Sequence, residues 1–167
     1  MNSLITGHII RFVVLVLFQV IVFNHINFLG YINPYVYILF ILFFPIKSNR
    51  LLFIFLSFLI GLSVDLFSDS GGIHAAASVA IGYARPVFLK FAFGTIYEYN
   101  HVKFDDVDFG SKIVYISLLT ALHHLLLFSF EIFSMSRILI ILQKTLFCGI
   151  FTILMITLIS IIFSRKS

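Results

Sequence analysis

The chain has 167 residues, of which 61% are hydrophobic and 11% are charged, and its formal net charge is +4. A soluble domain carries about 25% charged residues, so this composition excludes an ordinary water-soluble protein and indicates lipid as the surrounding medium. The basic residues occupy short gaps between apolar runs, which argues against a nucleic-acid partner. Because lipid does not tolerate unpaired backbone groups, we expect one all-α transmembrane domain over residues 1–167.

In chain order, six apolar runs approach the roughly 17 to 25 residues that a membrane-spanning helix needs. The first is predicted to be a span rather than a signal peptide, because no cleavage site follows it. The second and third are short, and the polar residues 47–50 between them, which include Lys47 and Arg50, predict a tight hairpin with its turn at a membrane face. The six predicted spans are residues 9–29, 31–46, 51–67, 73–93, 113–130 and 138–163.

Lysine and arginine are concentrated in alternate connections of this six-helix bundle and at both chain ends. By the positive-inside rule, this alternation predicts a multi-pass protein of the bacterial inner membrane with both termini in the cytoplasm. The longest polar stretch, residues 94–112, is then a cytoplasmic loop. Its acidic residues Asp105, Asp106 and Asp108 are expected to be solvated, with a docking site for a cytoplasmic protein as the alternative.

Small residues recur at every fourth position along the fourth run, namely Gly72, Ala76, Ala80 and Ala84. That spacing puts them on one helix face, where another backbone can approach closely. In the third run, Gly61 and Asp65 share a face by the same rule. The pattern predicts a tight helix pair, which either builds a small outward-facing polar cavity or partner site or is ordinary helix packing.

Two pairs of residues at the ends of this helix pair are informative. A carboxylate near a membrane surface needs a partner or water, so we expect Asp65 to hydrogen-bond His74 and fix the hairpin; a proton relay is the alternative. Pro86 is predicted to kink or end the fourth span at Arg85. Arg85 is then expected to reach lipid head groups or to contact a partner.

Polar residues within the last two runs predict contacts between helices rather than a catalytic or metal-binding site. His123 and His124 are adjacent, so they point in different directions and are not a metal pair. Lys144 is expected to extend to the interface or to pair with Glu131 or Asp65. The sequence has no phosphate-binding loop, paired metal ligands or nucleophile elbow, so we expect no enzymatic activity, no cofactor and no metal.

Residues 61–86 resemble the rod shape-determining protein MreD family, in the version found in Bacteroidetes-type bacteria. The resemblance is carried by Gly61, the Val-Asp-Leu around Asp65, a Ser/Gly turn, the Gly-Ile-His-Ala-Ala-Ala that follows it, and a final Gly-Tyr-Ala-Arg-Pro. Chain length and hydropathy agree over the rest.

The resemblance implies a non-enzymatic membrane scaffold of the cell-wall elongation complex, which organises peptidoglycan synthesis for rod shape. Its implied partners are MreC, with RodA, a penicillin-binding transpeptidase and MreB, besides membrane lipids. The family is also similar in fold to the substrate-binding subunits of energy-coupling factor transporters, so a vitamin-binding subunit is the rival interpretation. Against that rival, residues 12–23 are bulky and lack the Ala-x-x-x-Ala patch such subunits carry on the first span. A small-solute channel is a third class, which no filter-like element supports.

Overall fold

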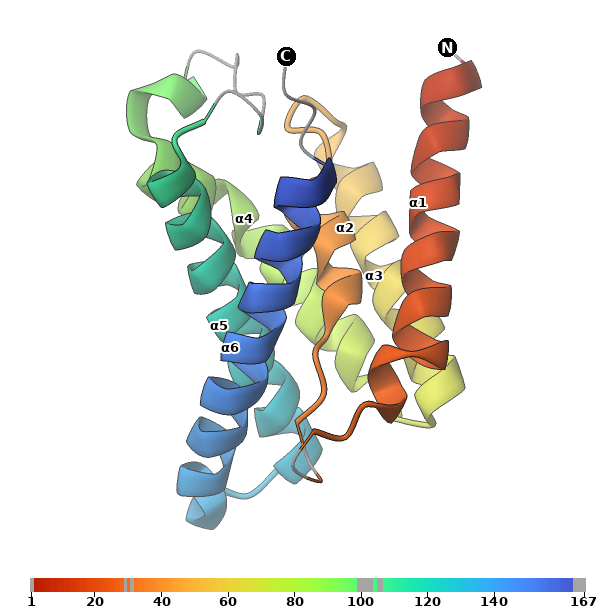
Figure 1. Cartoon of the computed structure of the whole chain (residues 1–167), viewed down its shortest axis with the longest axis vertical. Helices are drawn as coiled ribbons and strands as arrows, with labels where there is room; N and C mark the ends of the chain where they lie inside the picture. The colour runs from red at the N-terminus through yellow and green to blue at the C-terminus, as the bar shows by residue number, and fades with distance from the viewer. Residues whose placement is uncertain (1, 29, 31, 99–103, 105–106, 164–167) are drawn as a thin grey trace.

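The computed structural model describes residues 2–28, 30, 32–98, 104 and 107–163, and these form a helical bundle without a β-strand (Figure 1). Five helices in this part of the chain are long and apolar enough to cross a membrane. They are α1 (Asn2–Ile21), α3 (Arg50–Ser68), α4 (Ile73–Glu98), α5 (Phe109–Ile132) and α6 (Ile138–Phe163). The prediction of an all-helical membrane bundle is confirmed at this level.

Local sequence signals account for where several of these helices begin and end. The side chains of Asn49 and Asp108 accept hydrogen bonds from backbone amides in the first turns of α3 and α5, which are otherwise unpaired at a helix start. Asp69 and Phe133 follow the two helices in the left-handed conformation, with φ of 50° and 42°, and so terminate them.

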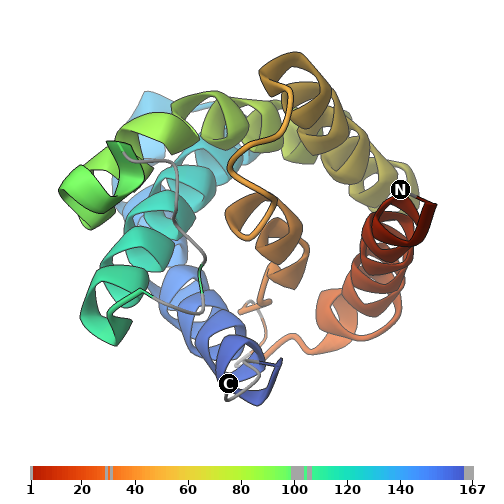
Figure 2. The ribbon, with the colours of Figure 1, turned by 90° about the horizontal axis from the view of Figure 1, so that it is seen from above.

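The second apolar run is not a membrane-spanning helix. Between α1 and α3 the chain forms a 3-10 turn, η2 (Val36–Ile38), and the four-residue helix α2 (Leu39–Leu42). We call residues 32–46 the central segment, because α2 lies inside the ring formed by the five long helices (Figure 2). An α-helix of this length would rise only about 22 Å, short of the roughly 30 Å hydrocarbon core. Residues 33–35, which precede η2, lie outside any helix.

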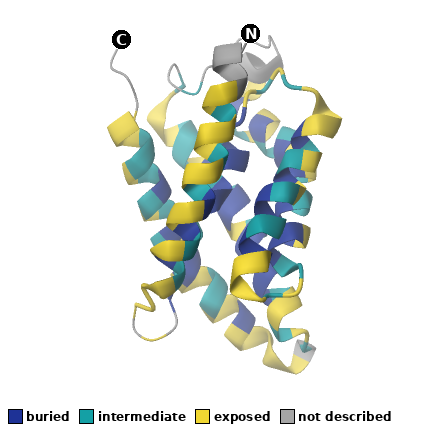
Figure 3. Cartoon of the chain, turned by 90° about the vertical axis from the view of Figure 1, so that its right-hand side faces the viewer, coloured by how far each residue is buried: buried dark blue, intermediate teal, exposed yellow. Residues whose placement is uncertain are grey.

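The central segment is the most deeply buried part of the molecule. Tyr37, Ile38, Ile41 and Leu42 are fully buried. The long helices, by contrast, expose apolar side chains on their outer faces. Figure 3 shows the exposed residues of α1 in yellow. Lipid-facing helices around a buried core are the arrangement expected of a membrane bundle.

The start of α1 and the end of α6 lie at the same end of the bundle (Figure 1). We call this the terminal end and the opposite end the distal end. The connection between the central segment and α3 also lies at the terminal end, whereas the turn between α3 and α4 lies at the distal end. Between α1 and α3, the central segment therefore leads from the distal end back to the terminal end.

Helix α4 continues past Pro86, so, of the two predicted effects of this proline, the end of the fourth span is wrong. The residue with non-helical dihedral angles is Gly94, with φ of 53° and ψ of −131°. Proline removes one backbone hydrogen bond from a helix, but a buried helix held by neighbours on both sides tolerates that loss.

Helices α3 and α4 approach closely at Gly61. A β-carbon built on Gly61 would lie 2.5 Å from the carbonyl oxygen of His74 and 2.6 Å from the Cα of Ala75. The predicted tight pair is therefore present, but the face of α4 that makes it differs from the prediction. Ala76 is exposed, and a β-carbon on Gly72 would meet nothing within 4 Å. Ala80 and Ala84 are only half-buried.

The buried face of α4 is offset from the predicted stripe. It is formed by Ala75, Ser78, Gly82, Arg85 and Leu89. These residues follow the three- and four-residue spacing of a single helix face. Gly82 repeats the close approach of Gly61, because its added β-carbon would lie 2.9 Å from the Ser57 hydroxyl on α3.

We expect Gly61→Ala to lower the free energy of unfolding of the detergent-purified protein by ~1–3 kcal/mol, the range typical of overpacking. The melting temperature should fall with it. The new methyl group would meet backbone atoms that cannot move independently of α4. The matched control is Gly149→Ala on α6, whose added β-carbon meets nothing within 4 Å. Equal melting temperatures for the two variants would contradict close packing at Gly61.

Candidate functional site

The distal half of the central segment receives its hydrogen bonds from side chains on α1 and α6. The Gln19 amide donates to the Pro34 carbonyl at 3.1 Å and accepts from the Tyr37 amide at 3.2 Å. The Thr152 hydroxyl oxygen accepts from the Tyr35 amide at 3.0 Å. Gln19 and Thr152 are both fully buried. They satisfy backbone groups that a regular helix would have paired internally.

Arg85 performs the same task where α2 ends. Its guanidinium donates to the carbonyls of Leu42 (3.2 Å) and Phe44 and to the Tyr115 hydroxyl (3.0 Å), and that hydroxyl donates to Leu42 at 2.9 Å. Arg85 is only 3% exposed, and its guanidinium also lies 4.8 Å from the centre of the Phe53 ring. The expectation that Arg85 reaches lipid head groups is therefore wrong, because its donors face the bundle interior.

A buried polar cluster surrounds the Tyr37 hydroxyl. This oxygen lies 3.1 Å from Nδ1 of His74 and 2.7 Å from Nε2 of His123, so it links α4 to α5 through the central segment. His124 lies 3.1 Å from the Thr152 hydroxyl. The prediction that His123 and His124 make buried contacts between helices is confirmed.

Asp65 and His74 are hydrogen bonded, but the contact differs from a side-chain pair. The Asp65 carboxylate accepts from the backbone amides of His74 (3.0 Å) and Ala75 (2.8 Å) and from the Ser70 hydroxyl (2.6 Å). Asp65 on α3 thus caps the first turn of α4. The partial positive charge of a helix start favours a carboxylate at this position. The His74 ring is directed to Tyr37 instead.

An open cleft of about 740 Å³ lies at the distal end. Its lining comes from the end of α1, the central segment, the α3–α4 turn and the end of α5. The polar residues of this lining include Asn24, Asn33, Tyr35, Asp69, His74 and Glu131. We call it the distal cleft. Because His74 lines the cleft and also contacts Tyr37, the cleft adjoins the buried polar cluster.

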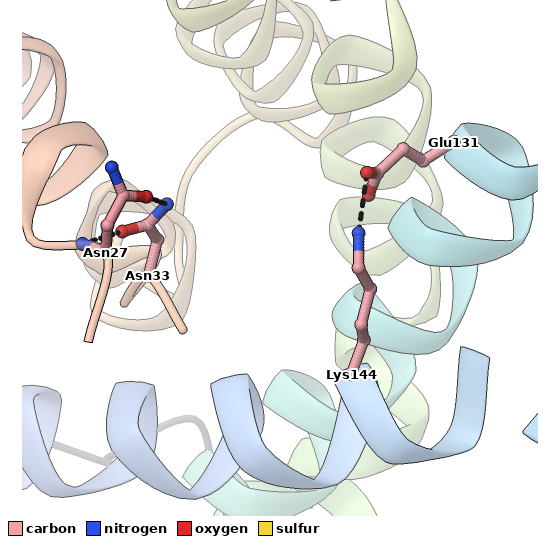
Figure 4. Close-up of polar contacts among 4 residues, drawn as sticks. All are labelled: Asn27, Asn33, Glu131 and Lys144. Carbon is pink, nitrogen blue, oxygen red and sulfur yellow. Dashed lines mark hydrogen bonds and ion pairs between the residues drawn. The ribbon is translucent and has the colours of Figure 1, made fainter. Parts of the chain in front are cut away.

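Two polar pairs hold the segments at the distal end together (Figure 4). Asn27 and Asn33 bond each other through two hydrogen bonds, which close the turn before the central segment. Lys144 on α6 donates to Glu131 on α5 at 2.8 Å. This is one of the two pairings predicted for Lys144; its other predicted partner, Asp65, is occupied by the start of α4.

The described residues contain no group of three or more histidine, cysteine or carboxylate side chains that would hold a metal ion. Of the acidic residues in the 94–112 loop, Asp105 and Asp106 lie outside the described residues. Asp108 caps α5 by accepting from the Ser111 amide. The docking-site interpretation of that loop therefore stays a prediction.

Gln19 and Thr152 were not singled out by the sequence analysis. Each was nevertheless visible as an isolated polar residue in the middle of an apolar run, where an amide or hydroxyl is costly unless it is bonded. The arrangement as a whole defines the class: this is a multi-pass helical membrane protein whose interior polar residues support a central segment that is only partly helical. No protein family, curated protein or solved structure matches the chain.

We expect Arg85→Met to destabilise the bundle strongly, because each carbonyl left unbonded in the interior costs about 1–3 kcal/mol. The measurement is the melting temperature in mild detergent. Arg50→Met is the control, since Arg50 is exposed and its guanidinium lies 5.0 Å from the centre of the Tyr83 ring. If the melting temperature of the Arg85 variant falls no further than that of the control, the proposed role of Arg85 is disproved.

Proposed function

We propose that this chain is a non-enzymatic inner-membrane scaffold of the MreD kind, which binds MreC within the cell-wall elongation complex. RodA, the penicillin-binding transpeptidase and MreB are further members of the assembly in this proposal. The observation that carries it is the resemblance over residues 61–86. Three residues of that segment have defined structural tasks: Gly61 permits the α3–α4 contact, Asp65 caps α4, and Arg85 bonds the central segment.

The distal cleft is the surface that we assign to MreC. With both termini in the cytoplasm, the cleft opens to the periplasm, where the segment of MreC next to its membrane helix would lie. Its lining offers amide, carboxylate and imidazole groups to a polypeptide. Clefts that combine such groups with apolar walls are typical recognition sites.

A vitamin-binding subunit is the second candidate, and one observation favours it. The cleft volume of about 740 Å³ falls within the range of small-molecule sites. Against it stands the outer face of α1, where bulky side chains such as Ile10, Val14 and Phe18 are exposed. That face offers no small-residue patch for docking to a transporter.

The orientation is testable with single cysteines in a Cys148→Ala background. We expect a membrane-impermeant thiol reagent to label Ser136→Cys, at the distal end, in intact spheroplasts. Lys47→Cys, at the terminal end, should react only after the membrane is opened. Both positions are exposed. The reverse pattern of labelling would place the distal cleft in the cytoplasm and remove the proposed role of that cleft in binding MreC.

Partner binding is testable by co-purification of tagged chain with MreC from the same bacterium after mild detergent extraction. Ser68→Trp places a large ring in the distal cleft, and we expect it to lower recovery of MreC about tenfold, equivalent to ~1.4 kcal/mol of binding free energy. Leu66→Trp is the matched control, because Leu66 lies on the same turn of α3, is 75% exposed and does not line the cleft.

The two candidate functions give different results in this experiment. Recovery of MreC with the wild-type chain and its loss with Ser68→Trp supports the scaffold. Failure to recover MreC, together with tight binding of a B vitamin by the purified wild-type chain, would replace the scaffold with the transporter subunit. Retention of MreC by both variants would keep the scaffold but move its contact surface away from the cleft.

A further inference from the structure

A second cavity, a groove of about 440 Å³, opens at the terminal end between α1, α2, α5 and α6. The ring of long helices is least closed here. Helix α1 packs on α3 and the central segment, and α6 packs on α5, but α1 and α6 make few direct contacts with each other. Figure 2, seen from the terminal end, shows α1 and α6 on either side of this opening. We call it the lateral groove.

The walls of the lateral groove are apolar, whereas its charged residues are both basic. Apolar side chains come from three helices, among them Leu15 on α1, Leu39 on α2 and Ile159 on α6. Among the residues that the structure describes, the charged members of the lining are Arg11 on α1 and Lys112 on α5, and none is a carboxylate. Neither cation forms a salt bridge with a described residue. The groove therefore combines two positive charges with an apolar surface.

The position of the two cations along the bundle favours a nearby anion. Arg11 lies more than one helical turn inside the candidate span that begins at Thr6. Lys112 is half-buried, with its ammonium 5.5 Å from the centre of the Phe43 ring. A cation at the edge of the hydrocarbon region is costly unless an anion or water reaches it. Anionic lipid head groups are at this depth and are attracted to lysine and arginine.

We propose that the lateral groove binds one anionic phospholipid. Its phosphate lies between Arg11 and Lys112, and an acyl chain extends along Leu15, Leu39 and Ile159. A free phosphate would satisfy the two cations but leave the apolar walls uncovered. A zwitterionic phospholipid would cover the walls but bring its own ammonium group toward two positive charges. The inference does not depend on MreC binding at the distal cleft.

The test uses the full chain, purified in detergent and stripped of lipid, in native mass spectrometry with equal amounts of phosphatidylglycerol and phosphatidylcholine. We expect one bound phosphatidylglycerol per chain, in clear preference to phosphatidylcholine. The double variant Arg11→Gln/Lys112→Gln should lower its occupancy about tenfold. Lys47→Gln is the matched control, because it removes one positive charge at the same end of the bundle but outside the groove.

Each result either supports the lipid site or overturns it. Equal retention of the two lipids, or unchanged phosphatidylglycerol binding by the double variant, overturns it. So does binding of glycerol phosphate as tight as that of the whole lipid. If the double variant does not fold, Ser160→Trp is used to test the lipid site instead. Ser160 lines the groove, and the change adds bulk without altering charge. Loss of the lipid from that variant, at an unchanged melting temperature, supports the site, and retention overturns it.

Discussion

The bundle depends on one constraint: a non-helical backbone in the centre of a membrane protein must have its amides and carbonyls bonded by something other than itself. The central segment breaks the internal pairing of a regular helix, and side chains from four surrounding helices replace it. Gln19, Thr152, Arg85 and Tyr115 are buried for this reason. Polar groups that would be destabilising in lipid are not destabilising here, because each forms a hydrogen bond with a backbone group.

The hairpin of α3 and α4 obeys the same constraint at its distal end. The first amides of α4 are bonded by Asp65 from the neighbouring helix, and Gly61 lets the two backbones meet. Gly61 and Asp65 are thus parts of the architecture, and we expect substitutions at them to act through the fold. We instead expect partner-binding surfaces where polar groups line an open cleft, as they do in the distal cleft.

Hydropathy predicted the five long helices, because lipid exposure demands long apolar runs. It did not predict the central segment, since hydropathy reports the environment of side chains and not backbone conformation. Pro34 and Pro45, which lie near the two ends of the segment, were a local signal against a regular helix. Spacing predicted that small residues share a face of α4, but not which face turns inward, so Ala76 was placed in a contact that Ala75 makes. The partners of Asp65 and Arg85 depend on tertiary structure, which spacing does not encode.

The central segment also imposes an order on biosynthesis. A ribosome releases this segment early, whereas Tyr115, His123 and Thr152, which bond it, are synthesised later. Until α6 leaves the translocon, the segment has backbone groups that lipid cannot satisfy. It must therefore wait in water, in the insertion machinery or as a transient helix, and take its final conformation last. The long helices therefore pack around the segment late, after all of them have been inserted.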